Sequence, residues 1–213
     1  MELTNLGNVS IRDKQIVREG YNKIASNYAA ARTSHSEDVR LLNKLVERLP
    51  KGAMVLDAGC GCGYPVAEFL AKFFQVTAVD FAEEQIRLAK KKVPDARFVF
   101  ADITNMPFND STFDAVCSYY AIIHVPRSEH RKLLIDFHRI LRPAGLALLC
   151  MGAGDRPEDV AEYYGTQMFW SHYGTETNLR MVKENGFDIL WFKTIEDPTS
   201  ESASHLFVLG QKR

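Results

Sequence analysis

A glycine-rich stretch in the first third of the chain reads Val55-Leu56-Asp57-Ala58-Gly59-Cys60-Gly61-Cys62-Gly63. It follows an apolar run over 53–57 that predicts a buried strand, and a helix over 65–73 is predicted directly after it. Glycines at alternate positions permit positive φ angles and leave bare backbone at the carboxyl end of the strand. Because the first N–H groups of the next helix point to the same place, the stretch predicts a binding site for a small molecule.

The charge beside this stretch indicates the kind of ligand. A pyrophosphate-binding turn has the pattern GxGxxG, but Val66 stands where the third glycine belongs, and Asp57 lies just before the loop. A carboxylate there opposes a diphosphate and favours a cationic ligand, such as one with an ammonium or a sulfonium group.

Two more carboxylates follow predicted strands. Asp80 ends the strand over 76–80, at the separation from the glycines at which an acidic side chain meets the two ribose hydroxyls of an adenosine. Phe81 comes next and could lie against the purine. Asp102 and Ile103 follow the strand over 97–101, where an adenine edge and face would arrive. A helix N-cap or a loop ion pair would explain any one carboxylate, but three strand ends at one sheet edge favour one binding crevice.

The rest of the chain alternates strands and helices, which predicts an α/β fold. Further strands are expected over 113–118 and 145–151, and helices over 82–92 and 128–141. A capping-box pattern at Ser34 and Glu37 predicts a helix that ends near Pro50, preceded by a helix with Tyr21 and Tyr28 on one stripe. After an aromatic segment and a helix over 175–186, two strands over 187–193 and 205–210 are expected to form an antiparallel hairpin, with a polar loop over 197–204 between them.

Composition excludes several classes of protein. The 213 residues are 46% hydrophobic and 25% charged, which predicts one ordered domain rather than a disordered or fibrous chain. The net charge of −1 gives no basic field for nucleic acid. Neither a leader nor an apolar run of membrane length is expected, and the four cysteines lack zinc spacing, so we expect no metal and a cytoplasmic, reducing location.

The combined pattern resembles the class I S-adenosylmethionine-dependent methyltransferases. The resemblance covers roughly 15–213 and rests on the pattern hh(D/E)hGxGxG over 55–63, on Asp80, on Asp102-Ile103, on the run over 113–116 and on the turn over 141–145, in which Ala144 departs from the family's glycine. It implies a Rossmann-like three-layer sandwich with a seven-stranded, mostly parallel sheet and one antiparallel strand. It also implies N-terminal lid helices over 1–50 and, over 51–213, a domain that binds S-adenosyl-L-methionine, with S-adenosyl-L-homocysteine as product.

The resemblance assigns roles around the cofactor. Gly59 and Gly61 would face its methionine moiety, with Asp57 acting on the amino-acid end directly or through water. Asp80 would meet the ribose, and Asp102 with Ile103 the adenine. Three tyrosines are further candidates for cofactor contact, two on the lid helix, where an ordinary core stripe is the alternative, and one after the fourth strand: Tyr21, Tyr28 and Tyr119.

Candidates for the acceptor side lie beyond the fourth and fifth strands. His124 is a candidate catalytic base for a phenol or a ring nitrogen, although a structural hydrogen bond is the simpler explanation. The insertion over about 155–174 is rich in aromatic rings, so we expect a small-molecule pocket there, with a helix buried against the lid or a subunit contact as alternatives. Its expected substrate-binding residues are Tyr164, Trp170, His172 and Tyr173.

The sequence therefore predicts an enzyme that transfers a methyl group from S-adenosylmethionine to a small organic acceptor by in-line displacement. A nicotinamide-dependent oxidoreductase shares the βα architecture but is disfavoured by Asp57 and the missing third glycine. A non-catalytic S-adenosylmethionine-binding module stays open, as does a protein or tRNA acceptor. The acceptor, the methylated atom and the oligomeric state are not assigned.

Overall fold

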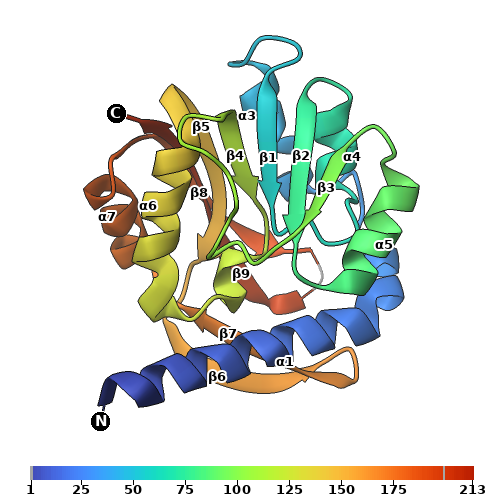
Figure 1. The fold of residues 1–213 in the computed structure, drawn as a ribbon, viewed down its shortest axis with the longest axis vertical. Helices are drawn as coiled ribbons and strands as arrows, with labels where there is room; N and C mark the ends of the chain where they lie inside the picture. The colour runs from blue at the N-terminus through green and yellow to red at the C-terminus, as the bar shows by residue number, and fades with distance from the viewer. Residues whose placement is uncertain (1, 199) are drawn as a thin grey trace.

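The computed structural model describes residues 2–198 and 200–213, with side chains over 10–198 and 203–213. Its centre is one seven-stranded sheet in the order β3-β2-β1-β4-β5-β9-β8 (Figure 1). The strands are β1 (Met54–Ala58), β2 (Gln75–Asp80), β3 (Arg97–Phe100), β4 (Phe113–Ser118), β5 (Leu141–Gly152), β8 (Phe187–Asp197) and β9 (Ser200–Lys212). Only β9 runs against its neighbours β5 and β8, which confirms the predicted sheet with one antiparallel strand.

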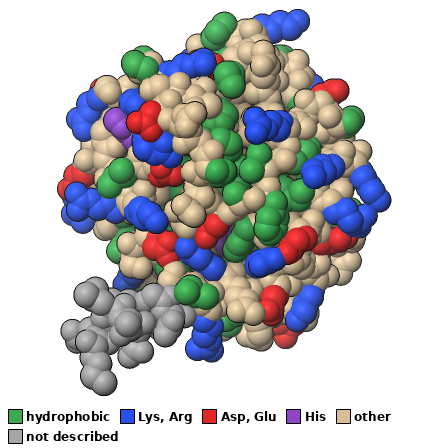
Figure 2. Space-filling model, viewed as in Figure 1, with side chains coloured by type: hydrophobic (Ala, Val, Ile, Leu, Met, Phe, Trp, Pro, Cys, Tyr) green, Lys and Arg blue, Asp and Glu red, His purple; other side chains and the backbone are tan. Residues whose placement is uncertain are grey.

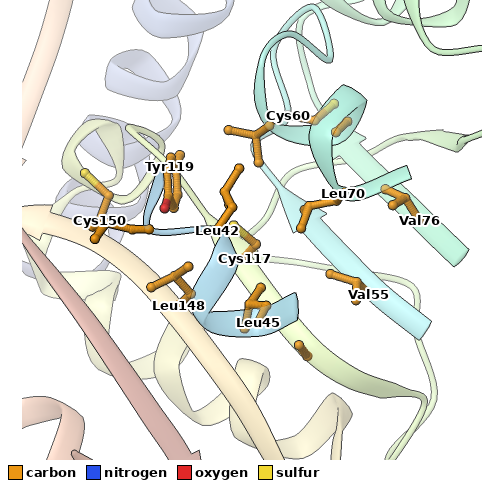
Figure 3. Packing of buried hydrophobic residues seen from close by; sticks show 14 of the residues in the cluster. Leu42, Leu45, Val55, Cys60, Leu70, Val76, Cys117, Tyr119, Leu148 and Cys150 are labelled. Atoms are coloured by element: carbon orange, nitrogen blue, oxygen red, sulfur yellow. The ribbon is translucent and has the colours of Figure 1, made fainter. Parts of the chain in front are cut away.

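Helices cover both faces of the sheet and make the predicted three layers. On one face lie α2 (Glu37–Arg40), α3 (Asn43–Val46), α4 (Val66–Ala71) and α5 (Glu83–Lys92). On the other lie α6 (His130–Ile140) and α7 (Thr175–Glu184). The strands are apolar on both sides because both sides are buried. On the face covered by α2 to α5, Leu42, Leu45 and Leu70 pack on Val55 and Cys117 of the sheet (Figure 3).

The N-terminal helix and a separate hairpin lie together across the carboxyl ends of the parallel strands (Figure 1). The helix is α1 (Glu2–Ala31), and the hairpin consists of β6 (Arg156–Tyr163) and β7 (Thr166–His172). Val17 and Ile24 of α1 pack against Met168 and Phe169 of β7 in a small core of their own. Helix α1 and the β6–β7 hairpin together cover the edge of the sheet at which the glycine-rich loop follows β1.

Two local predictions were wrong, and one alternative is excluded. The predicted helix after Ser34 is two short helices, and the first begins at Glu37 with Ser36 as its N-cap and with no side-chain cap bond. The predicted polar loop over 197–204 is mostly strand, because β8 extends to Asp197 and β9 begins at Ser200. The aromatic insertion is a β-hairpin, which excludes the alternative of a helix buried against α1, although the hairpin does pack against α1.

The turn over 141–145 shows what the departure at Ala144 means. Ala144 is exposed and has a φ of 60°, in the left-handed region that favours glycine. Alanine therefore adopts there the backbone conformation that the family's glycine supplies without strain.

Candidate active site

The glycine-rich loop leaves β1 and is fixed against β2. The amide groups of Gly59 and Cys60 both donate to the carbonyl of Val79, at 2.8 and 2.9 Å. Gly59 and Gly61 have φ angles of 82° and 53°, as the glycine pattern predicts. A Cβ atom on Gly59 would lie 2.2 Å from the Cβ of Ala121, so the space beside this glycine is taken by the segment after β4.

Asp80 at the end of β2 holds the loop from the other side. One carboxylate oxygen accepts the Gly61 N–H at 2.8 Å, and the other accepts the Ala82 N–H at 2.9 Å. Burial raises the pKa of Asp80, while these backbone donors act in the opposite direction. A carboxylate accepts about four hydrogen bonds, so the Asp80 carboxylate keeps a lone pair for a hydroxyl group of a ligand.

Asp57 at the end of β1 is a buried carboxylate without a hydrogen-bond partner on either oxygen among the described residues. Burial raises its pKa to about 8, with a further contribution from nearby Asp80. An unpaired buried carboxyl group is costly, and a positive group placed beside it would remove that cost. Asp57 therefore suits a ligand that brings an ammonium group to this end of the loop.

These residues surround one cleft with about 630 Å³ of empty space, which we call the donor cleft. Nine of the ten predicted cofactor residues line it: Tyr21, Tyr28, Gly59, Gly61, Asp80, Phe81, Asp102, Ile103 and Tyr119. The tenth, Asp57, lines a smaller hollow that shares Tyr28, Gly59, Gly61 and Tyr119 with the cleft. The structure thus brings together all ten predicted cofactor residues, from α1 and from the carboxyl ends of the strands β1, β2, β3 and β4.

Lys14 is a residue of the cleft that the sequence analysis missed. Its Nζ donates to Thr104 Oγ1 at 2.7 Å and to Glu129 Oε2 at 2.8 Å, and lies 3.2 Å from Asp102 Oδ2. These bonds tie α1 to the end of the cleft predicted to hold adenine. The spacing of seven residues from Lys14 to Tyr21 could have revealed it, because the next such step reaches Tyr28 on the same helix face.

A second, larger cavity with about 1460 Å³ of empty space lies beside the donor cleft, and we call it the acceptor cavity. Trp170 and His172 line it, as predicted for the acceptor pocket. Tyr164 does not, since it sits in the hairpin turn with 41% of its surface exposed. Tyr173 does not either, and instead contacts other residues beyond the cavity. Tyr163 of the same aromatic insertion lines it too, and so do residues missed by sequence reasoning, among them Arg32, Arg156 and His205.

The two cavities meet at four shared residues. Tyr21, Tyr28, Tyr120 and His124 line both of them. His124 is buried there, with Nδ1 2.6 Å from the carbonyl oxygen of Phe169 and Nε2 2.9 Å from the hydroxyl of Tyr21. Burial lowers the pKa of His124 to about 4, so its imidazole is neutral at neutral pH.

Comparison with known proteins identifies methyltransferases among the similar proteins. Residues 55–145 match the family described as "Methyltransferase domain". An O-methyltransferase of Aspergillus nomiae, rstn1, is 27% identical over 178 residues, which are 78% of either chain. A malonyl-[acyl-carrier protein] O-methyltransferase of Pseudescherichia vulneris is 32% identical over 152 residues, which are 70% of this chain and 59% of the relative, so this chain spans about three fifths of that protein.

Solved structures share the fold. The 1,6-didemethyltoxoflavin-N1-methyltransferase of Burkholderia thailandensis, solved with its substrate and S-adenosylhomocysteine, has a TM-score of 0.75 at 20% identity and covers 95% of this chain and 90% of its own. A methyltransferase of Methanosarcina mazei has a TM-score of 0.70 at 24% identity, covering 79% and 96%.

Three features define a Rossmann-like methyltransferase fold with a nucleoside-binding crevice: the strand order of the sheet, the glycine-rich loop, and the carboxylates at the ends of consecutive strands. The chain matches the methyltransferase-domain family over residues 55–145, which agrees with its resemblance to the class I S-adenosylmethionine-dependent methyltransferases. It is therefore an enzyme whose cofactor is S-adenosyl-L-methionine. The nicotinamide-dependent oxidoreductase and the non-catalytic module are set aside.

Proposed function

We propose that the enzyme methylates a small organic molecule held in the acceptor cavity. The carrying observation is that this cavity meets the donor cleft at Tyr21, Tyr28, Tyr120 and His124. A methyl group placed at this junction would face a nucleophile held in the acceptor cavity. Alignment of this kind contributes roughly 7–11 kcal/mol to a two-reactant step.

The residues of the donor cleft fit the cofactor. Unpaired Asp57 suits its ammonium group, and Asp80 keeps a lone pair for a ribose hydroxyl. Phe81 and Ile103 supply apolar surface for the adenine. When bound, S-adenosylmethionine supplies a methyl group on a positively charged sulfur. The protein's part is to hold the donor and the acceptor in line and to exclude water from the junction.

The walls of the acceptor cavity favour a planar organic acceptor with polar substituents. Trp170 and Tyr163 both line the cavity and meet edge to face, with their ring centroids 5.6 Å apart. Arg156 lies over the Trp170 ring at 4.5 Å, and Arg32 over the Tyr120 ring at 4.5 Å. Several relatives are named for small or carrier-bound acceptors, such as malonyl-[acyl-carrier protein] and demethylmenaquinone, which supports the same class of substrate, whereas a relative from Arabidopsis thaliana is named for tRNA.

A nucleic-acid acceptor and a membrane substrate are outside this proposal. The chain has a net charge of −1, and the face drawn in Figure 2 mixes Lys and Arg with Asp and Glu rather than gathering one sign. Within the described residues no helix has the length and hydropathy to cross a bilayer. We place the enzyme in the cytoplasm, which the four buried cysteines support because none forms a disulfide.

Two measurements test the proposal. Calorimetry with S-adenosylhomocysteine is expected to show binding that is lost in Asp80→Ala. Methyl-labelled S-adenosylmethionine is then incubated with the enzyme and a deproteinised extract of small metabolites, with tRNA and total protein in parallel reactions. We expect labelled product in the metabolite reaction only, and none with Asp80→Ala. Label in tRNA or protein but not in metabolites would show that the acceptor class is wrong.

A further inference from the structure

We propose that the acceptor is a carboxylate, that one of its oxygen atoms takes the methyl group to give a methyl ester, and that Arg32 binds this carboxylate in the acceptor cavity. The inference rests on the proposed function, because it places an acceptor at the junction of the two cavities. It adds the chemical class of the methylated group and a residue that binds it.

Among the described residues, the four that line the junction offer no group to take a proton from the acceptor. The imidazole of His124 is fully occupied, because Nδ1 donates to a backbone carbonyl of β7 at 2.6 Å and the lone pair of Nε2 accepts the Tyr21 hydroxyl at 2.9 Å. Tyr120 donates its hydroxyl to Asp38 Oδ2 at 3.0 Å. Burial raises the pKa of Tyr28 to about 12, so this phenol keeps its own proton at neutral pH.

The carboxylates of the acceptor cavity lie away from this junction. Asp155, Glu162 and Asp197 line the cavity but not the donor cleft. Glu162 is exposed on the hairpin, Asp155 is paired with Arg127 at 3.2 Å, and Asp197 is paired with His205 at 2.8 Å. An alcohol, a phenol or an ammonium group must lose a proton when it is methylated, whereas a carboxylate reacts without losing one. The junction therefore suits a nucleophile that is already ionised.

Arg32 is a positive group built into the wall of the acceptor cavity. Its side chain is 4% exposed, its guanidinium lies over the Tyr120 ring at 4.5 Å, and Nη2 donates to Asp38 Oδ2 at 2.9 Å. Asp38 lines neither cavity, so the cationic partner of this pair faces the cavity and the carboxylate lies behind it. A guanidinium has five N–H donors in a planar fork, which matches the two oxygens of a carboxylate better than the single atom of a thiolate.

A second arginine gives the interior of the cavity the same sign. Arg156 lines the cavity, while its partner Asp159, to which Nε donates at 2.9 Å, does not. Burial lowers the pKa of His124 to about 4 and lowers that of His172, and the positive charge of Arg156 contributes to both. Two arginines whose counter-charges lie outside the cavity favour an anionic ligand within it.

The transfer balances without a base. A lone pair of one carboxylate oxygen forms the new carbon–oxygen bond, and the carbon–sulfur bond breaks with its electron pair returning to sulfur. No proton moves, and the products are a methyl ester and S-adenosylhomocysteine. Because the charges of the carboxylate and of the sulfonium are both consumed, the transition state is less charged than the reactants. Arg32 therefore binds and orients the acceptor rather than stabilising the transition state.

The first test needs no variant. The labelled product formed from the deproteinised metabolite extract is treated with mild alkali, which releases the methyl group of a methyl ester as volatile methanol and leaves methyl ethers and N-methyl groups intact. We expect the label to become volatile. A label that stays on the alkali-treated product overturns the inference and leaves the proposed function standing. Absence of any labelled metabolite refutes the proposed function itself.

The second test assigns Arg32, with rates measured over a dilution series of the same extract. Arg32→Gln should raise the half-saturating concentration of the extract about 10–100-fold, the loss expected for a charge-assisted hydrogen bond. The maximal rate and the Kd of S-adenosylhomocysteine should stay within about threefold. Arg32→Lys keeps the charge and should recover part of the loss. Arg142→Gln, which also loses an ion pair, at 2.7 Å to Asp114, and lines neither cavity, is the matched control and should behave like the unmodified enzyme.

Two results overturn the role of Arg32. One is an unchanged half-saturating concentration in Arg32→Gln. The other is a loss of S-adenosylhomocysteine affinity as large as the loss for the extract, which would place Arg32 on the carboxylate of the cofactor. Because Arg32→Gln leaves Asp38 buried without its partner, the double variant with Asp38→Asn removes both charges and is measured beside it. Should neither fold, Arg32→Lys and the product chemistry still decide.

Discussion

Replacement of Asp57 by asparagine tests how the donor cleft recognises a positive charge. Asp57 is buried, with neither oxygen partnered among the described residues, and burial raises its pKa to about 8. At pH 7 the empty protein therefore carries a proton on about nine of ten Asp57 side chains. An ammonium group beside the carboxyl favours the ionised form, so binding of S-adenosylhomocysteine should release this proton.

The magnitude follows from the pKa. Ionising Asp57 at pH 7 costs about 1.4 kcal/mol, since pH 7 lies about one unit below its pKa. The apparent affinity should rise about tenfold per pH unit below pH 8 and level off above it, with about 0.9 protons released per ligand at pH 7. Asparagine cannot ionise, so Asp57→Asn should release no proton. It should also lose the charge-assisted contact, worth about 1.5–3 kcal/mol.

Calorimetry at pH 7 measures both effects. Binding heats are compared in phosphate and in Tris, whose ionisation enthalpies differ, so the difference between the buffers counts the protons released. Asp188→Asn, at an exposed carboxyl on β8, is the matched control and should behave like the unmodified protein. Equal heats in both buffers for the unmodified protein would show that Asp57 does not meet the cationic end of the ligand.

Three further outcomes are expected. Lys14→Met removes the bonds between α1 and the loop of Asp102, so dissociation of S-adenosylhomocysteine should be about fivefold faster in stopped-flow experiments, consistent with a partly exposed ion pair. Trp170→Ala removes a wall of the acceptor cavity and should raise the acceptor KM about tenfold or more, while calorimetry shows the cofactor Kd unchanged; equal loss of both would refute the pocket. Ala144→Gly relieves a left-handed alanine and should stabilise the fold by about 0.5–1 kcal/mol in urea titrations.

The donor side could be predicted from sequence because its signals are local. Each strand is a short apolar run ended by an acidic or glycine residue, and parallel strands bring such ends to one sheet edge. Asp57, Asp80 and Asp102 therefore had to lie near one another once the strands were found. The structure adds what no local pattern contains, namely that Ala121 fills the space beside Gly59 and that Lys14 reaches Asp102.

The hairpin over 156–172 could not be predicted in the same way. Its turn is Tyr164-Gly165, with φ angles of 50° and 80°, whereas two-residue turns of this geometry are usually marked by Asn-Gly or Asp-Gly. In β7, Met168 and Phe169 are both buried, one after the other, so the alternation expected of a half-buried strand is absent. The aromatic residues predicted a pocket, but the hairpin that carries them lacks the alternation of apolar and polar residues that predicts a strand.

The helix α1 lines both the donor cleft and the acceptor cavity. Lys14 and Tyr28 are fourteen residues apart on α1, so the helix spans about 21 Å and reaches from the adenine end of the donor cleft to the junction with the acceptor cavity. Tyr21, between them, donates to His124, whose other nitrogen bonds the hairpin. The acceptor cavity thus has complete walls only while α1 is docked over the donor cleft. We therefore expect the acceptor site to be complete only when the donor site is covered by α1, which would keep water away from the sulfonium.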